Sequence, residues 1–76
     1  MARIEVKSEI TGTVWQLKAK PGDKVEGGDV LIVIESMKME IEIHATQAGD
    51  VSKIIKQRGH SVTAGQTLLW LSDGES

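Results

Sequence analysis

The sequence predicts an all-β fold, a flattened barrel or sandwich of short antiparallel strands with approximate twofold symmetry. Short runs rich in Val, Ile and Thr alternate with turn residues throughout the 76-residue chain, which contains eight Gly and one Pro. No segment carries the sustained 3.6-residue period of an amphipathic helix. The chain also repeats itself: when it is shifted by 37 residues, its two halves align without gaps, for example Gly12 with Gly49.

Six runs are predicted to be strands, because each is short, rich in β-branched residues and bounded by Gly, Asp, Ser or Pro. The runs Val30–Ile34 and Leu68–Leu71 are continuously apolar, and their short length and flanking glycines favour strands over helices. The run Met39–His44 alternates, with Met39 and Ile41 on the face expected to meet the core. In chain order the predicted strands are Arg3–Lys7, Thr13–Leu17, Val30–Glu35, Met39–His44, Val51–Ile55 and Thr67–Leu71.

The internal repeat matches glycines with glycines and apolar positions with apolar positions. A unit that cannot bury its apolar face alone is typically completed by a second copy. We therefore expect two copies packed face to face, with the repeated glycines at turns or bulges that need positive φ or close backbone approach. The identical pairs include Gly12/Gly49, Val14/Val51, Gly22/Gly59, Val25/Val62, Gly28/Gly65 and Leu31/Leu68.

The joint between the two copies is Ser36-Met37-Lys38, which connects two predicted strands with almost no residues to spare. Only a tight hairpin can make this connection, with Met37 and Lys38 as its central pair. Two-residue hairpins favour type I′ turns, whose central residues both have positive φ and are usually Asn or Gly. A non-glycine residue held there costs about 1–3 kcal/mol, and such strain tends to persist where function requires it. The pattern therefore marks the hairpin tip as a functional position.

Lys38 is expected to project into solvent as the substrate of another enzyme rather than as a nucleophile. An exposed lysine is an ammonium ion at neutral pH and is therefore inert. Burial cannot activate it at a hairpin tip, and Glu35, Glu40 and Glu42 nearby favour its charged form. A solvated turn lysine, one of seven lysines in the chain, is the alternative that the residues alone leave open.

The composition argues against several classes of function. The absence of Cys rules out a disulfide scaffold, a thiolate zinc site and a thiol nucleophile. A formal net charge of -2 and only two aromatic residues argue against nucleic-acid binding. No run approaches the ~20 apolar residues of a membrane span, and no signal peptide opens the chain. We therefore expect a cytoplasmic domain over residues 1–72 with a short polar tail over 73–76, and neither a membrane nor a nucleic-acid partner.

The remaining candidate residues favour structure over chemistry. His44 and His60 lie far apart in the sequence without a third ligand, so no metal site is expected. Trp15 and Trp70 occupy strand positions and are expected in or beside the core. The serines suggest no pairing of nucleophile and base, and the glycines form no phosphate loop. The chain is therefore expected to be non-catalytic.

The joint resembles a known modification site. The segment Glu35-Ser36-Met37-Lys38-Met39-Glu40 resembles the (Ala/Ser)-Met-Lys-Met attachment motif of biotinyl domains, the biotin carboxyl carrier family.

The resemblance covers nearly the whole chain. Gly12-Thr13-Val14 resembles the family's second strand, and Pro21–Asp29 and Gly59–Gln66 resemble its two glycine-containing loops. In this chain Ser36 stands where Ala is commonest, and Ser8-Glu9-Ile10-Thr11 replaces a frequent Pro-Met-Pro segment. The short stretch between the second strand and the first loop has no room for the protruding thumb of some carriers. The chain thus resembles the compact, stand-alone attachment proteins.

The resemblance implies a barrel-sandwich hybrid of two four-stranded antiparallel sheets. It also implies that a biotin protein ligase joins biotin to the Lys38 amine. A biotin carboxylase and a carboxyltransferase would then load and unload a carboxyl group. Met37 would contact these partners, whereas Met39 would seat the hairpin on the core. The residues implied for ligase recognition are Glu35, Ser36 and Glu40, with solvated strand charges as the alternative for the two acids.

Three other functions remain as alternatives. A lipoyl domain shares the fold and the hairpin lysine, but usually carries Asp before the lysine and a small or β-branched residue after it. Met37 and Met39 therefore favour biotin over lipoate, and a dual biotin and lipoyl acceptor remains open. An unmodified interaction module of the same fold normally lacks the lysine. An OB-like nucleic-acid binder is disfavoured by the acidic charge and the few aromatic residues.

Overall fold

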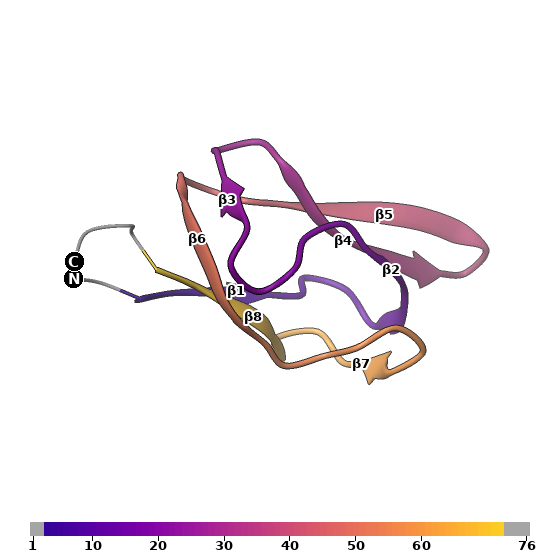
Figure 1. Cartoon of the computed structure of the whole chain (residues 1–76). Coiled ribbons are helices and arrows are strands. Elements are labelled where there is room, and N and C mark those ends of the chain that lie inside the picture. The colour runs from indigo at the N-terminus through magenta and orange to yellow at the C-terminus, as the bar shows by residue number, and fades with distance from the viewer. Residues whose placement is uncertain (1–2, 73–76) are drawn as a thin grey trace.

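The computed structural model describes residues 3–72, and this part of the chain contains eight strands and no helix, hence none long and apolar enough to cross a membrane. The all-β prediction is confirmed, whereas the predicted tail at 73–76 lies outside the described residues. The body measures 40 × 18 × 17 Å (Figure 1). The strands are β1 Arg3–Lys7, β2 Gly12–Leu17, β3 Lys24–Val25, β4 Val30–Ser36, β5 Met39–His44, β6 Gly49–Ile54, β7 Ser61–Val62 and β8 Thr67–Ser72.

The six strands predicted from β-branched runs all form, and their bounds differ from the prediction by at most one residue, except that β6 begins two residues earlier, at Gly49. The two short strands β3 and β7 were not predicted from the residues. Each has only two residues, of which one, Val25 or Val62, is buried. A single buried residue shows no periodicity, so a sequence pattern cannot distinguish these two strands from the glycine-containing loops around them.

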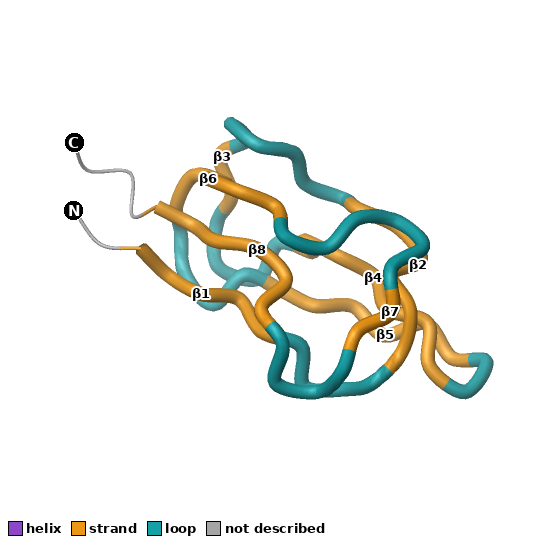
Figure 2. The backbone as a smooth tube through the Cα atoms, turned by 90° about the horizontal axis from the view of Figure 1, so that it is seen from below, coloured by secondary structure: helices purple, strands orange, loops and turns teal. Residues whose placement is uncertain are grey.

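The eight strands form two four-stranded antiparallel sheets, with the orders β1-β8-β6-β3 and β5-β4-β2-β7. Each sheet therefore takes two strands from each half of the repeat (Figure 2). The predicted face-to-face packing of the two copies is wrong in this respect, because the copies interlock. Within a copy only β2 and β4, or β6 and β8, pair with each other, and the other strands pair across the copies.

The twofold symmetry extends to the hydrogen bonds of the turns. The amide of Gly22 donates to the carbonyl of Val51 at 2.8 Å, and the equivalent amide of Gly59 donates to Val14 at 2.8 Å. The four repeated turn glycines have φ between 90° and 96°, a region that glycine reaches without a steric penalty. The predicted role of these glycines is confirmed for Gly22, Gly28, Gly59 and Gly65.

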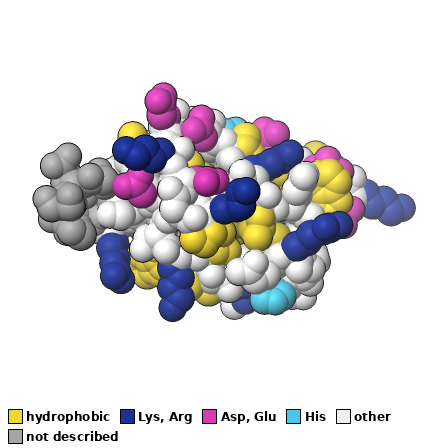
Figure 3. Space-filling model, in the orientation of Figure 1, with side chains coloured by type: hydrophobic (Ala, Val, Ile, Leu, Met, Phe, Trp, Pro, Cys, Tyr) yellow, Lys and Arg dark blue, Asp and Glu magenta, His cyan; other side chains and the backbone are white. Residues whose placement is uncertain are grey.

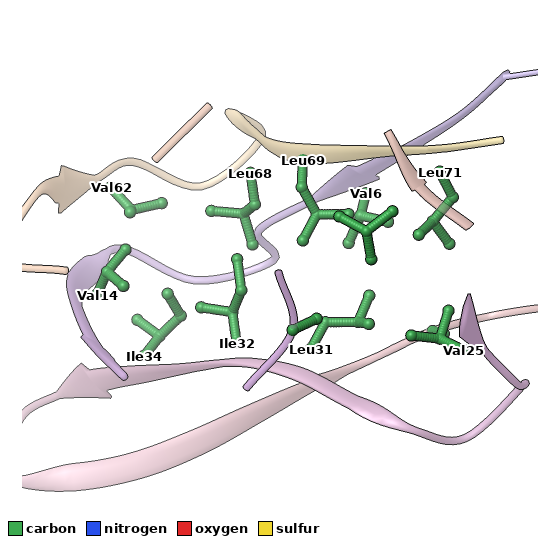
Figure 4. Packing of buried hydrophobic residues seen from close by; sticks show 13 residues of the cluster. Val6, Val14, Val25, Leu31, Ile32, Ile34, Val62, Leu68, Leu69 and Leu71 are labelled. Atoms are coloured by element: carbon green, nitrogen blue, oxygen red, sulfur yellow. The ribbon is translucent and has the colours of Figure 1, made fainter. Parts of the chain in front are cut away.

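Aliphatic side chains from both sheets meet between them and form the core (Figure 4). Leu31 and Leu68, a pair in the repeat, are both fully buried. Burying a side chain of this size stabilises a fold by about 1.5–3 kcal/mol. The labelled core residues are Val6, Val14, Val25, Leu31, Ile32, Ile34, Val62, Leu68, Leu69 and Leu71.

The two tryptophans lie differently from each other. Trp70 is half-buried, whereas Trp15 is 43% exposed, so the predicted place of Trp15 in or beside the core is wrong. The register of β2 against β4 shifts between Val14 and Gln16, which makes Trp15 the extra residue of a bulge. A bulged residue leaves the regular alternation of the strand, and this one turns its ring outward.

Candidate functional site

The joint between the two copies is a two-residue hairpin. Ser36 and Met39 form its closing pair, and Met37 and Lys38 are the central residues with φ of 53° and 67°. Positive φ at both central positions is the requirement of a type I′ turn, so the predicted geometry is confirmed. Met37 and Lys38 are the non-glycine residues with positive φ in the described part of the chain, and each holds strain on the order of 1–3 kcal/mol.

The hairpin projects from one end of the elongated body. It lies at the end opposite to the start of β1 and the end of β8, which pair with each other through Arg3 and Ser72 (Figures 1 and 2). In the space-filling view a cationic side chain extends beyond the rest of the surface at this end (Figure 3). The lysine is therefore presented to solvent far from both ends of the described chain.

The side chains of the tip are uncovered. Met37 is 92% exposed and Met39 63% exposed, and Lys38 is exposed between them. Neither ion pair found within residues 3–72 involves Lys38. These residues fit a covalent attachment site, because nothing in the described structure occupies the lysine amine or screens it from a modifying enzyme.

The predicted seating of Met39 on the core is wrong. Alternation along β5 does hold, since Ile41 and Ile43 are half-buried. However, the pairing of β2 with β4 ends at Thr13 and Glu35, so the hairpin continues past the end of the neighbouring strand. Met39 therefore lies beyond the last pair between β2 and β4, and a pair of exposed methionines flanks the lysine.

Two carboxylates face each other at the base of the turn. Glu35 of β4 and Glu40 of β5 are directly opposite in the register, and both are exposed. Like charges directly opposite each other destabilise a sheet. The predicted acidic flank of Lys38 is therefore present on the hairpin, while its recognition by a ligase stays a prediction.

Ser36 faces the body of the protein rather than the tip. It is half-buried, and its hydroxyl donates a hydrogen bond of 2.8 Å to the backbone carbonyl of Thr11. Its predicted part in ligase recognition stays a prediction. Thr11 was not among the site residues predicted from the sequence, and no local pattern could have revealed a contact across 25 positions.

The two histidines make local contacts instead of a metal site. His44 lies 3.5 Å from a carboxylate oxygen of Glu42, and Nδ1 of His60 accepts a hydrogen bond from the amide of Gln57 at 3.1 Å. Within residues 3–72, no group of three or more His, Cys, Asp or Glu side chains is placed to hold a metal ion.

Comparison with known proteins agrees with this geometry. The chain is 40% identical over 68 residues to the biotin/lipoyl attachment protein of Bacillus subtilis, covering 90% of this chain and 93% of the relative. It is equally similar, 40% over 68 residues, to a biotinylated protein TB7.3 homologue of Mycobacterium leprae, covering 90% of this chain and 96% of the relative.

A solved structure gives the same result in three dimensions. A segment of the urea carboxylase of Kluyveromyces lactis superposes with a TM-score of 0.88 at 39% identity, covering 93% of this chain and 6% of that protein. The sequence family described as "Biotin-requiring enzyme" matches residues 4–71. Because this match spans nearly the whole chain, and the lysine hairpin lies at its centre, the chain belongs to the biotin/lipoyl attachment family.

Proposed function

We propose that this chain is a biotin carboxyl carrier whose prosthetic group is attached to Lys38. The observation that carries the proposal is the strained two-residue turn, which holds Lys38 exposed between two exposed methionines. Apolar side chains left in solvent at such a position are suited to contact with partner proteins. Membership of the biotin/lipoyl attachment family supports the same role.

The chain contributes presentation rather than catalysis. A biotin protein ligase would activate the carboxyl group of biotin as its adenylate, and the Lys38 amine would displace AMP to form an amide. The proton that the amine loses as the amide forms would pass to the ligase or to water. The bound biotin would then carry a carboxyl group from a biotin carboxylase to a carboxyltransferase in the cytoplasm.

Tethering explains why a separate carrier is useful. A biotin held on Lys38 would meet both enzymes at an effective concentration set by the arm and by the position of the domain. The hairpin extends the reach of the arm, since it projects beyond the body at the end opposite to the start of β1 and the end of β8 (Figure 1).

The experiment is intact-mass spectrometry after incubation with a biotin protein ligase, biotin and ATP. We expect one biotinyl group on the wild type and none on Lys38→Arg. Lys20→Arg is the matched control, since Lys20 is also an exposed lysine at a turn, and we expect it to be modified like the wild type. Incorporation into Lys38→Arg, or none into the wild type, would contradict the proposal.

The lipoate alternative is tested in the same format. Incubation with a lipoyl ligase and lipoate should leave the mass of the wild type unchanged. If Lys38 gains a lipoyl group in this incubation and a biotinyl group in the separate incubation with the biotin ligase, the chain is a dual acceptor. A lipoyl mass without biotinylation would replace biotin with lipoate as the group that is carried.

A further inference from the structure

A set of hydrogen bonds ties the root of the lysine hairpin to the body. The Ser36 hydroxyl donates to the Thr11 carbonyl at 2.8 Å. The Thr11 hydroxyl in turn accepts from the amide of Ala64 at 3.1 Å. Thr11 therefore links the end of β4 to the turn between β7 and β8, although these segments lie far apart in the sequence.

A third hydroxyl fixes the segment that carries Thr11. Ser8 is 1% exposed, and its hydroxyl donates to the carbonyl of Ile10 at 2.6 Å and accepts from the amide of Ile10 at 3.2 Å. Its backbone is held as well, because its amide donates to Gln66 at 3.0 Å and its carbonyl accepts from Gly65 at 2.7 Å. The segment contains no Pro, so these bonds restrain it in place of a ring.

The internal repeat supplies a built-in control. The positions equivalent to Ser8 and Thr11 in the second copy are Ala45 and Ala48. The backbone bonds of Ser8 are nevertheless repeated there, since the amide of Ala45 donates to Asp29 at 2.8 Å and its carbonyl accepts from Gly28 at 2.8 Å. The fold thus forms at this position without a hydroxyl, and the hydroxyls occur in the copy whose segment supports the lysine hairpin.

We infer that Ser36 and Thr11 are positioning residues, which hold the hairpin in one orientation so that a modifying enzyme meets Lys38 correctly placed. The inference rests on the proposed function. The hairpin extends past the last pair between β2 and β4. The pairing of β4 with β5 holds its two strands together, and the bond from Ser36 to Thr11 restrains the direction of the hairpin relative to the body. Without that bond the tip samples more orientations. The apparent affinity of the protein for the modifying enzyme then falls in proportion to the fraction of molecules whose hairpin has the orientation that binds.

The first test uses the unmodified protein and measures ¹⁵N order parameters of the backbone. We expect lower order parameters at Met37 and Lys38 in Ser36→Ala and in Thr11→Val. Ser36→Thr retains a hydroxyl and should restore the wild-type values. Ser52→Ala is the matched control, because Ser52 is an exposed serine on β6 in the other sheet.

The second test measures biotinylation by a biotin protein ligase with saturating biotin and ATP and varied carrier concentration. We expect Ser36→Ala to raise the KM for the carrier by about two- to ten-fold, the range for loss of one hydrogen bond, with kcat unchanged. The double variant Ser36→Ala/Thr11→Val should raise KM by less than the product of the single effects, because both residues act on one element.

Two results would overturn the inference. The first is that Ser36→Ala has the same order parameters and the same KM as the control Ser52→Ala. The second is that Ser36→Thr does not have the wild-type order parameters and KM. Either result leaves the proposed function intact as long as the wild type is biotinylated on Lys38. Absence of biotin from the wild type would instead remove the proposed function, and the order parameters would still report on the hairpin.

Discussion

Gly12 and Gly49 occupy the same position in the two copies of the repeat and make the same close approach to a neighbouring strand. A Cβ on Gly12 would overlap the carbonyl oxygen of Glu35, and one on Gly49 would overlap that of Ser72. Neither glycine has positive φ, so the requirement at both positions is space for the neighbouring backbone. Of the two, Gly12 lies against the root of the lysine hairpin.

We expect Gly12→Ala and Gly49→Ala each to lower the free energy of unfolding by about 1–3 kcal/mol, because the added methyl group must displace a backbone carbonyl. Gly27→Ala is the control, since the nearest atom to its Cβ would be at 3.6 Å, an ordinary contact. Chemical denaturation measures these changes. At a temperature where all variants are folded, Gly12→Ala should slow biotin incorporation more than Gly49→Ala. Equal rates for the two would show that the Glu35 backbone does not set the hairpin geometry.

Relief of the strain in the Met37-Lys38 turn should increase the stability of the fold. Met37→Gly should raise the free energy of unfolding by about 1 kcal/mol, because glycine adopts the φ of 53° without the penalty of a side chain. Met39→Gly should lower it by about 0.5–1 kcal/mol, since Met39 lies in the regular strand β5. Urea titration followed by circular dichroism distinguishes the two.

The same Met37→Gly variant should be a poorer substrate for the ligase, measured as kcat/KM for the carrier. It loses an exposed apolar contact surface next to Lys38 while gaining stability. A variant that is more stable and also biotinylated at the wild-type rate would mean that Met37 is not a contact residue. A less stable one would mean that the turn is not strained.

A substitution at the facing carboxylates Glu35 and Glu40 can distinguish their effect on stability from their role in recognition by the ligase. Glu40→Lys replaces a repulsive cross-strand pair with an attractive one and should stabilise the fold by about 0.2–1 kcal/mol, with the gain reduced at high salt. Its rate of biotinylation should nevertheless fall if the ligase reads the acidic flank, as we expect. Glu26→Lys makes the same charge change at an exposed turn position and serves as the control. If both variants are modified at the wild-type rate, Glu40 is only a solvated strand charge.

The features that could be predicted from the sequence depend on short stretches of chain. Six strands follow from local runs of β-branched residues, and the type I′ turn follows from the lack of residues between Glu35 and Met39. The repeat, a comparison of the chain with itself, predicts the twofold symmetry and the positive φ of four glycines. The candidate lysine could be found because it lies at the joint between the two copies, in a turn whose residues are unusual for positive φ.

The pairing of the strands was decided by the tertiary structure. The sequence shows two copies, but it does not say whether a strand satisfies its backbone groups within its own copy or in the other. The copies interlock, so each sheet draws two strands from each half. The short strands β3 and β7 exist because such long-range partners are available, and no local period marks them.

The all-β class, the symmetry and the turn that presents Lys38 follow from local stretches of chain, because backbone propensity and chain length act locally. The exposure of Met39, which depends on where the neighbouring β2 ends, and the support of Ser36 by Thr11 arise only in the folded protein. Burial and hydrogen bonding between distant segments depend on which surfaces meet after folding. The identity of the lysine is therefore a property of the sequence, whereas the orientation in which it is presented is a property of the fold.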